Sequence, residues 1–524
     1  MDVTPTPFSG HPRRRQVLAV MCLSLLIVVV DNTVLNTALP SLARALHATS
    51  TDLQWITDGY TLAFAALLIV AGALGDRFGR RGALLLGLSI FGAGSVAAAL
   101  SGSPEALIAC RAVMGVGGAF VMPATLSILT SVFPAKERAG AIAAWSGVAG
   151  IAIVVGPTLG GFLLEHFSWS SVFWINVPLV VVALGAVTTV VPAMPPSASA
   201  DGRRPRLDVL GAGLSALGML ALIDAVIEAG DRGWTSALTL GEGAAAAALF
   251  AAFIARELTT AHPLIDVRIF ANRAFSAAAV SVGLIFFALF GSLFGLTQYL
   301  QLVHGYSPLS AGLRALPFAA AVLVAAPLSS PLAARVGARV VIPAGLVFMG
   351  AGLLALYDVT PTTGVVHISV GVALMGTGMG LALAPAGESI MSVLPERERG
   401  VGSAVNDTVQ ELGGSLGVAV IGSLVTAAYR SNFTAAAVHL PATIVQPARG
   451  SVAAADATAT HSGPYAASVT QAADQAFTSA MTHGFLVAAL VALVGAALTA
   501  WALPGRAATS VVEPEIPRLE PVTS

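Results

Sequence analysis

Residues 72–81 read GALGDRFGRR and join two apolar segments near 55–75 and 82–101. An acid and a cluster of arginines between apolar segments of membrane-spanning length indicate a short turn at a membrane surface. The glycines allow helix ends to approach neighbouring backbone closely. The carboxylate of Asp76 can accept hydrogen bonds from a helix N-terminus or pair with an arginine. We therefore predict a conformational latch here, formed by Gly72, Asp76, Arg77, Gly79, Arg80 and Arg81.

The composition places the chain in a lipid bilayer. Hydrophobic residues make up 56% of the 524 positions and charged residues 10%, whereas soluble domains carry about 25% charged residues. The net charge of -1 gives no sign of the concentrated basic face that is typical of nucleic-acid partners. The sequence has no phosphate-binding Walker loop, and its nine histidines lack the spacing of metal ligands. We expect a membrane protein that is not an enzyme and uses no cofactor or metal.

Apolar segments long enough to cross the bilayer recur along the chain. At about 20 apolar residues per crossing, the sequence predicts an all-α integral membrane fold with fourteen transmembrane helices. We expect a six-helix bundle over 17–192, an inserted helix pair over 209–257 and a second six-helix bundle over 275–503. The predicted spans are 17–38, 55–75, 82–101, 106–130, 139–163, 172–192, 209–229, 238–257, 275–300, 310–333, 340–358, 366–390, 401–428 and 483–503.

The distribution of positive charge predicts the orientation of these spans. Cytoplasmic loops are enriched in Lys and Arg, and most of the 26 basic residues fall on one side when the N-terminus is placed in the cytoplasm. The tails 1–16 and 504–524 and the linker 193–208 are then cytoplasmic. Residues 429–482 form a long external loop, either flexible or containing a short surface helix. The high Ala and Gly content is typical of GC-rich bacterial genomes, so we expect a bacterial cell membrane.

Among the charged residues inside predicted spans are Asp31 in the first and Arg111 in the fourth. A charge at the bilayer centre costs about 2.5 kcal/mol or more, and it usually faces a bundle interior or water. Arg111 could alternatively snorkel to the interface or pair with Glu105, and Asp31 could be an acid at an external helix end. We expect Asp58, near the start of the second span, to cap its helix or face water.

The fifth span is rich in glycine and proline. These residues predict a close, kinked crossing against a neighbouring helix, although Gly and Pro are common in membrane helices in general. The residues concerned are Gly150, Gly156, Pro157, Gly160 and Gly161.

Aromatic and polar side chains mark a candidate substrate path. Phe286 and Phe290 share one helix face at i and i+4, where they could contact lipid, the protein core or a bulky apolar substrate. A polar cluster in the span 401–428 either borders the path or gates it from the cytoplasmic side. Its members are Asn406, Asp407, Gln410 and Glu411.

Together these motifs resemble the major facilitator superfamily. The loop at 72–81 is similar to the family's loop signature, and further segments are similar to its fourteen-helix drug:proton antiporters. These segments are DNTVLNTALP at 31–40, Gln54-Trp55 with Tyr60, Arg111 with Gly115, Gly117 and Gly118, GPTLGG at 156–161, FWINVP at 173–178 and SPLSAG at 307–312. The acid at Asp58 departs from the pattern of that branch.

The resemblance implies two bundles that expose a central cavity to one side of the membrane at a time. It also implies export of hydrophobic or amphipathic small molecules, such as drugs or antibiotics, in exchange for protons. A proton-coupled importer or a uniporter on the same fold is the first alternative, and a membrane receptor without transport activity is the second. We expect the substrate path to include Asn36, Trp55, Tyr60, Phe286, Phe290, Asn406 and Gln410.

The same resemblance places Asp31 and Arg111 in one bundle, so we predict that this pair couples transport to protons. Arginine stays charged at any working pH, which leaves the carboxylate as the group that must gain and lose the proton. The alternative proton carriers are Asp58, Asp407 and Glu411.

Overall fold

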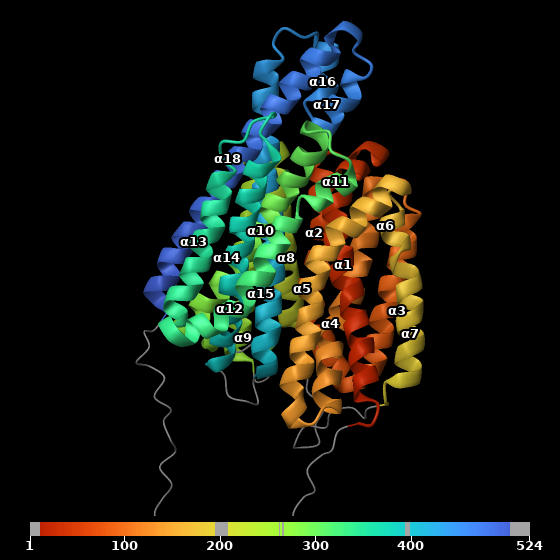
Figure 1. The fold of residues 1–524 in the computed structure, drawn as a ribbon, viewed down its shortest axis with the longest axis vertical. Helices are drawn as coiled ribbons and strands as arrows, with labels where there is room; N and C mark the ends of the chain where they lie inside the picture. Colours follow the sequence, from red (N-terminus) through yellow and green to blue (C-terminus); the bar gives the residue numbers. More distant parts are fainter. Residues whose placement is uncertain (1–10, 194–207, 261–262, 265–266, 394–398, 504–524) are drawn as a thin grey trace, which may run out of the picture.

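The computed structural model describes residues 11–193, 208–260, 263–264, 267–393 and 399–503, and the regular structure within these ranges is helical (Figure 1). Among the described residues, twelve helical segments are long and apolar enough to cross a membrane. Helices satisfy their own backbone hydrogen bonds, which a lipid environment requires. The chain is therefore a multi-pass membrane protein.

Short capped turns set the helix boundaries of the N-terminal bundle. The Thr49 hydroxyl accepts a hydrogen bond from the Asp52 N–H, and the Asp52 carboxylate accepts one from the Thr49 N–H, which is a capping box. The Ser103 hydroxyl caps the helix that begins at Pro104. The helices of this bundle are α1 Arg14–Leu46, α2 Ser50–Phe78, α3 Arg80–Ala99, α4 Pro104–Val132, α5 Ala135–His166, α6 Ser171–Trp174 and α7 Asn176–Val190.

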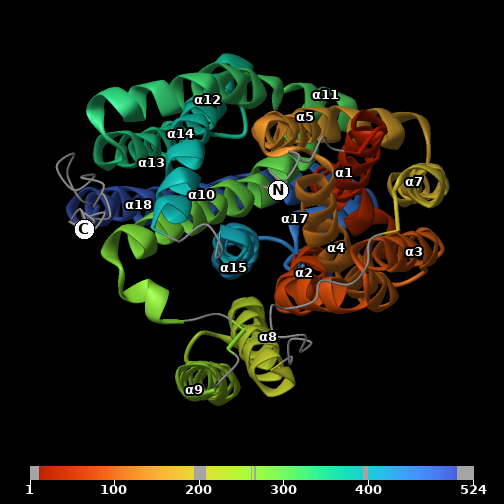
Figure 2. The ribbon, with the colours of Figure 1, turned by 90° about the horizontal axis from the view of Figure 1, so that it is seen from below.

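A helix hairpin lies outside the two bundles, beside α2 and α15 (Figure 2). It consists of α8 Val209–Arg232 and α9 Ala237–Thr259. Asp208 joins their ends, because its carboxylate accepts from the Gly211 N–H at 3.0 Å and pairs with Arg256 at 2.9 Å. These two interactions, the Gly211 hydrogen bond first, hold the pKa of Asp208 below its usual range.

The C-terminal bundle follows the hairpin. Its α15 has the bounds Arg399–Ala436, and it packs against α2 and α8 as well as against its own bundle. The remaining elements are η1 Val267–Ala271, α10 Arg273–Gln298, η2 Tyr299–Val303, α11 Pro308–Leu313, α12 Leu316–Val336, α13 Ala338–Ala355, α14 Val365–Ser392 and α18 Ala466–Ala502.

Helices also occupy much of the segment expected to be a long external loop. Between α15 and α18 lie α16 Ala442–Ala448, α17 Val452–Ala459 and η4 Gly463–Tyr465, which project beyond the bundles at one end (Figure 1). The Tyr429 hydroxyl donates to the carbonyls of Ala448 and Ser451, both at 3.1 Å, and so ties this cap to α15. The expectation of a flexible loop over 429–482 is therefore wrong, and the alternative with helical structure is correct.

Each bundle has its own main apolar core, and the two cores adjoin at Phe290 and Phe294 of α10. Polar contacts join the bundles at the end that carries the cap. Gln301 donates its side-chain N–H to the Thr37 carbonyl at 2.8 Å, and Ser307 donates to Glu165 at 3.1 Å. Both bonds join one bundle to the other. The two described ends of the chain, at His11 and Leu503, lie at the opposite end of the molecule (Figure 1).

Each of the predicted spans overlaps a helix, and twelve of them overlap the twelve apolar segments. The twelve apolar segments leave out α2 and α5, which coincide with the predicted spans 55–75 and 139–163. Residues 1–10 of the N-terminal tail, residues 194–207 of the linker 193–208 and the tail 504–524 lie outside the described residues.

Candidate functional site

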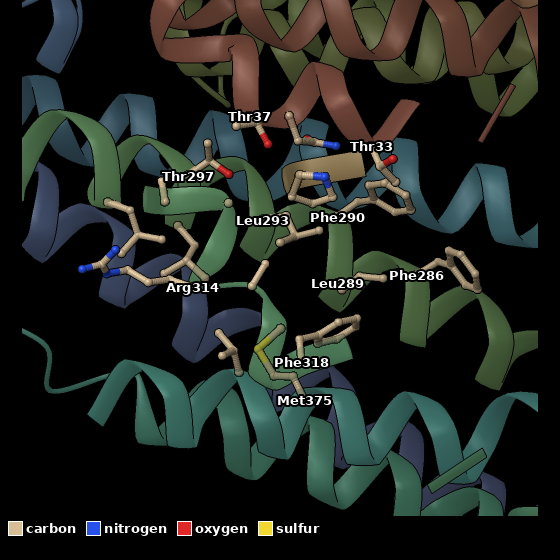
Figure 3. A pocket seen from close by; sticks show the side chains of 18 residues that line it. Thr33, Thr37, Phe286, Leu289, Phe290, Leu293, Thr297, Arg314, Phe318 and Met375 are labelled. Carbon is tan, nitrogen blue, oxygen red and sulfur yellow. The ribbon is translucent and has the colours of Figure 1, made fainter. Parts of the chain in front are cut away.

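An apolar cavity lies between α1 and α5 on one side and α10, α11, α12 and α14 on the other. It holds about 1010 Å³ of space between atoms, part of which is open to solvent. Phe286 and Arg314 lie at opposite ends of it in Figure 3. Its lining consists of Thr33, Asn36, Thr37, Pro157, Phe286, Leu289, Phe290, Leu293, Leu296, Thr297, Leu300, Ala311, Gly312, Arg314, Ala315, Phe318, Val372 and Met375.

Three of the predicted path residues line this cavity: Asn36, Phe286 and Phe290. Asn36 shares a face of α1 with Thr33 and Thr37, since residues three and four apart lie on one side of a helix. This face supplies polar groups to a wall that is mostly apolar and whose other polar members are Thr297 and Arg314.

The other four predicted path residues do not line the cavity. Trp55 packs against a cluster that includes Ile223 of α8, and Tyr60 is buried inside the N-terminal bundle. Asn406 donates to Asp407 at 3.3 Å, and Gln410 lies one turn further along α15. The sequence patterns therefore did not show which of these side chains face the cavity.

Asp31 and Arg111 form a buried ion pair rather than facing the cavity. Their side chains are 2% and 0% exposed, and Arg111 Nη1 lies 2.5 Å from Asp31 Oδ2. Asp31 lies on the side of α1 away from Thr33 and Asn36. The alternatives of snorkelling and of pairing with Glu105 are wrong for Arg111 in this structure.

Further polar groups complete the surroundings of this pair. The Asn176 amide donates to Asp31 Oδ1 at 2.7 Å and to the Ser95 hydroxyl at 3.1 Å. Arg111 Nε donates to the Ile56 carbonyl at 3.2 Å, and the guanidinium lies 4.3 Å from the Tyr60 ring centroid. A charge pair held by neutral partners can persist without water.

The roles of Asn176 and Ser95 were missed in the sequence. Asn176 is an amide inside an apolar run of a predicted span, and a polar group in that position must find a partner. The sequence therefore showed that Asn176 needs a partner, but it did not show that the partner is Asp31, 145 positions away along the chain.

The glycines of α5 lie where the helix crosses its neighbours. A Cβ on Gly156 would overlap the Thr33 hydroxyl, and one on Gly160 would lie 3.0 Å from a Val34 methyl. A Cβ on Gly161 would lie 2.5 Å from the Leu309 Cα of α11, in the other bundle. The surroundings of Gly150 lie outside the described residues.

The loop between α2 and α3 makes a tight turn at Gly79, whose φ of 105° is unfavourable for residues with a side chain. The Gly79 N–H donates to the Gly75 carbonyl at 2.9 Å. Arg80 donates to the Ser127 carbonyl at 3.1 Å and Arg81 to the Thr188 carbonyl at 2.5 Å. The arginines thus join the ends of α4 and α7 to this turn. A Cβ added to Gly72 would lie 3.6 Å from the Pro123 side chain of α4. The side chains of Asp76 and Arg77 lie outside the described residues.

A smaller, acidic chamber lies on the other side of Phe290, which lines both spaces. Asp58 and Glu411 both contribute to its wall. Asp58 is fully buried, and its Oδ1 accepts from the Ser415 hydroxyl of α15 at 2.9 Å. Its Oδ2 is buried and has no hydrogen-bond partner within the described ranges. The expectation that Asp58 caps its helix or faces water is wrong, because α2 begins at Ser50, two turns earlier.

Relatives and solved structures agree with this architecture. The tetracenomycin C resistance and export protein of Streptomyces glaucescens is 35% identical over 95% of this chain and 93% of its own length. The multidrug efflux pump LfrA of Mycolicibacterium smegmatis (strain ATCC 700084 / mc(2)155) is 35% identical over 95% of this chain and 98% of its own. A bacterial homolog of the human lysosomal transporter Spinster, in an inward-facing and unoccupied crystal structure, has a TM-score of 0.66. It covers 95% of this chain and 100% of its own at 18% identity, which shows the fold alone.

A model of the Major Facilitator Superfamily matches residues 21–418, which is most of the chain. The match spans the ion pair, the glycines of α5, the acidic chamber and the whole cavity wall. The relatives are named for resistance and export, which makes the chain a transporter rather than an enzyme. The chain belongs to the Major Facilitator Superfamily.

Proposed function

We propose that the protein exports hydrophobic or amphipathic small molecules, drugs or antibiotics among them, across the bacterial cell membrane in exchange for protons. The observation that carries the proposal is the apolar cavity whose wall is shared by both bundles. A ligand held there would contact α1 and α10 at once. Rocking one bundle against the other would then expose the ligand to the opposite side. The export names of the relatives support the outward direction.

The contacts between the bundles support a state that is closed at the end carrying the cap. Gly161 meets Leu309 there, and Gly312 meets the Pro157 carbonyl, so that the backbones of α5 and α11 touch. Export requires this contact to break. The glycines allow two backbones to approach closely and to separate again without any interlocked side chain.

We infer fourteen crossings, with both chain ends in the cytoplasm. The helices α2 and α5 have 29 and 32 residues, so at 1.5 Å per residue they are about 43 and 48 Å long. Both exceed the roughly 30 Å hydrocarbon core. The arginine-rich turn at Gly79 is then a cytoplasmic latch between α2, α4 and α7.

Proton coupling needs a carboxylate whose surroundings change during the cycle. Asp31 and Arg111 form a buried ion pair inside one bundle, and we propose that breaking this pair accompanies proton uptake. Asp58 is the acid at the moving interface, since its hydrogen-bond donor Ser415 belongs to the other bundle. Separating α2 from α15 would remove that bond. Asp58 is therefore a second candidate carrier, with Glu411 beside it.

The test uses purified protein in proteoliposomes with an imposed proton gradient. Uphill movement of an aromatic drug against the inward proton flow supports export. Uptake in the same direction as the proton supports the importer, and gradient-independent equilibration supports the uniporter. Binding without any flux supports the receptor and rejects transport.

A further inference from the structure

We propose that the cavity selects aromatic molecules that carry an anionic group, and that Arg314 binds that group. This inference rests on the proposed export function and adds a substrate class to it. Arg314 is the one ionisable side chain in the cavity wall among the described residues.

Arg314 is held in place by its own neighbours. Its Nη1 donates to the Ser310 carbonyl at 2.6 Å and also contacts the Ser310 hydroxyl. The guanidinium lies 3.6 Å from the centroid of the Tyr306 ring, which stacks in turn on His304. A guanidinium fixed in this way loses little side-chain entropy when a ligand binds.

Arg314 keeps unused hydrogen-bonding capacity at the site. Its Nε is buried and has no hydrogen-bond partner in the described part of the chain. Arginine presents donors in a planar fork that matches a carboxylate or sulfonate. No ion pair is formed by Arg314 within the described ranges, so its charge is available to a ligand.

The described wall of the cavity adds no second charged side chain. Burial, and then the nearby positive charge of Arg314, lower the pKa of His304, so that imidazole is neutral at physiological pH. The carboxylates of Asp58 and Glu411 lie in the separate chamber behind Phe290. A cationic ligand in the apolar cavity would therefore meet a fixed positive charge in a medium of low polarity, which is unfavourable.

The rest of the wall suits a flat aromatic body. Phe286, Phe290 and Phe318 offer ring faces and edges, and Met375 adds a polarisable sulfur (Figure 3). Thr33 and Asn36 lie on the α1 side and can bond to hydroxyl or carbonyl substituents. An aromatic acid would thus place its ring among the phenylalanines and its anion at Arg314.

The test compares two probes that share one ring system, anthracene carboxylate and aminomethyl anthracene. Their affinities for the full-length protein in lipid nanodiscs are measured by fluorescence titration. We expect the carboxylate to bind more tightly than the amine. Arg314→Gln should weaken carboxylate binding about tenfold or more, as loss of a hydrogen bond to a charged group does, and leave the amine unchanged. Arg314→Lys should retain part of the preference.

The matched control is Arg449→Gln, which removes an exposed charge in the cap at the same end of the molecule. It should change neither affinity. Equal binding of both probes by the wild type, or equal loss of both in Arg314→Gln, overturns the inference. Gradient-driven flux of each probe is measured separately. Flux of both probes without a preference for the carboxylate rejects the role of Arg314 but leaves the proposed export standing. Preference without flux rejects the proposed export.

Discussion

Replacing Asp31 by Asn should destabilise the protein strongly, because it leaves the Arg111 charge buried without its counterion. The guanidinium is fully buried, and its remaining partners are the Ile56 carbonyl at 3.2 Å and the Tyr60 ring. Removing one member of a buried ion pair costs about 3–5 kcal/mol. A central arginine costs about 2.5–3.5 kcal/mol on membrane-insertion scales. We therefore expect Asp31→Asn to lower the free energy of unfolding by about 3 kcal/mol.

The assay is a double-mutant cycle on reversible unfolding in mixed micelles. The variants are Asp31→Asn, Arg111→Gln and the two combined, with Glu137→Gln as the control for the exposed Arg14–Glu137 pair. The combined variant has no unpaired charge, so it should be more stable than Arg111→Gln or Asp31→Asn alone. The coupling free energy between Asp31 and Arg111 in this cycle then measures the strength of the ion pair directly.

The same variants separate a structural role from proton coupling. If the pair couples transport, the combined variant recovers stability but not gradient-driven efflux, while substrate binding stays measurable. Strictly additive losses of stability in the cycle would refute the ion-pair reasoning. Wild-type pH dependence of efflux in Asp31→Asn would refute its part in coupling.

Three further predictions concern the moving parts. Gly156→Leu should impair or uncouple export and lower the free energy of unfolding by about 1–3 kcal/mol, because the new side chain overpacks against Thr33. Gly185→Leu is the control and should do neither, because an added Cβ there meets open space. Normal pumping by Gly156→Leu contradicts the close crossing. Asp76→Asn should preserve membrane insertion and slow turnover, measured as efflux rate at equal expression, and an unchanged rate rejects the latch. If Asp58 carries the proton in place of Asp31, Asp58→Asn should remove the pH dependence of efflux and Ser415→Ala should only shift it. Unchanged pH profiles in both variants exclude the acidic chamber from coupling.

The sequence located the helices well but not their ends. Apolar runs show which part of a helix lies in lipid. They end where α15 and α18 leave the expected bilayer, so they did not predict how far these two helices continue. Beyond that point, α15 continues to Ala436 because Tyr429 stacks with Phe433 and contacts Phe477 edge-on. Alanine-rich segments such as the α18 start also favour a helix by propensity. A hydropathy threshold detects neither effect.

The candidate site was predictable where a single residue is costly by itself. Asp31 and Arg111 stand out because a charge in a membrane span needs a partner. Side-chain directions were not predictable: Trp55, Asp58 and Tyr60 lie on one helix, yet they face α8, α15 and Arg111 respectively. Those directions depend on neighbours far away in sequence, such as Ser415, which is 357 positions from Asp58.

The central claim is exchange of drug for protons, and simultaneous recording of both fluxes tests it most directly. Proteoliposomes hold a pH-sensitive dye inside, and a fluorescent aromatic drug is followed in the same sample. The account predicts that drug moving one way drives protons the other way. It also predicts that a protonophore abolishes uphill drug movement, and that the Asp31→Asn, Arg111→Gln double variant shows neither flux. Uphill drug movement without proton movement, or undiminished by the protonophore, would contradict it.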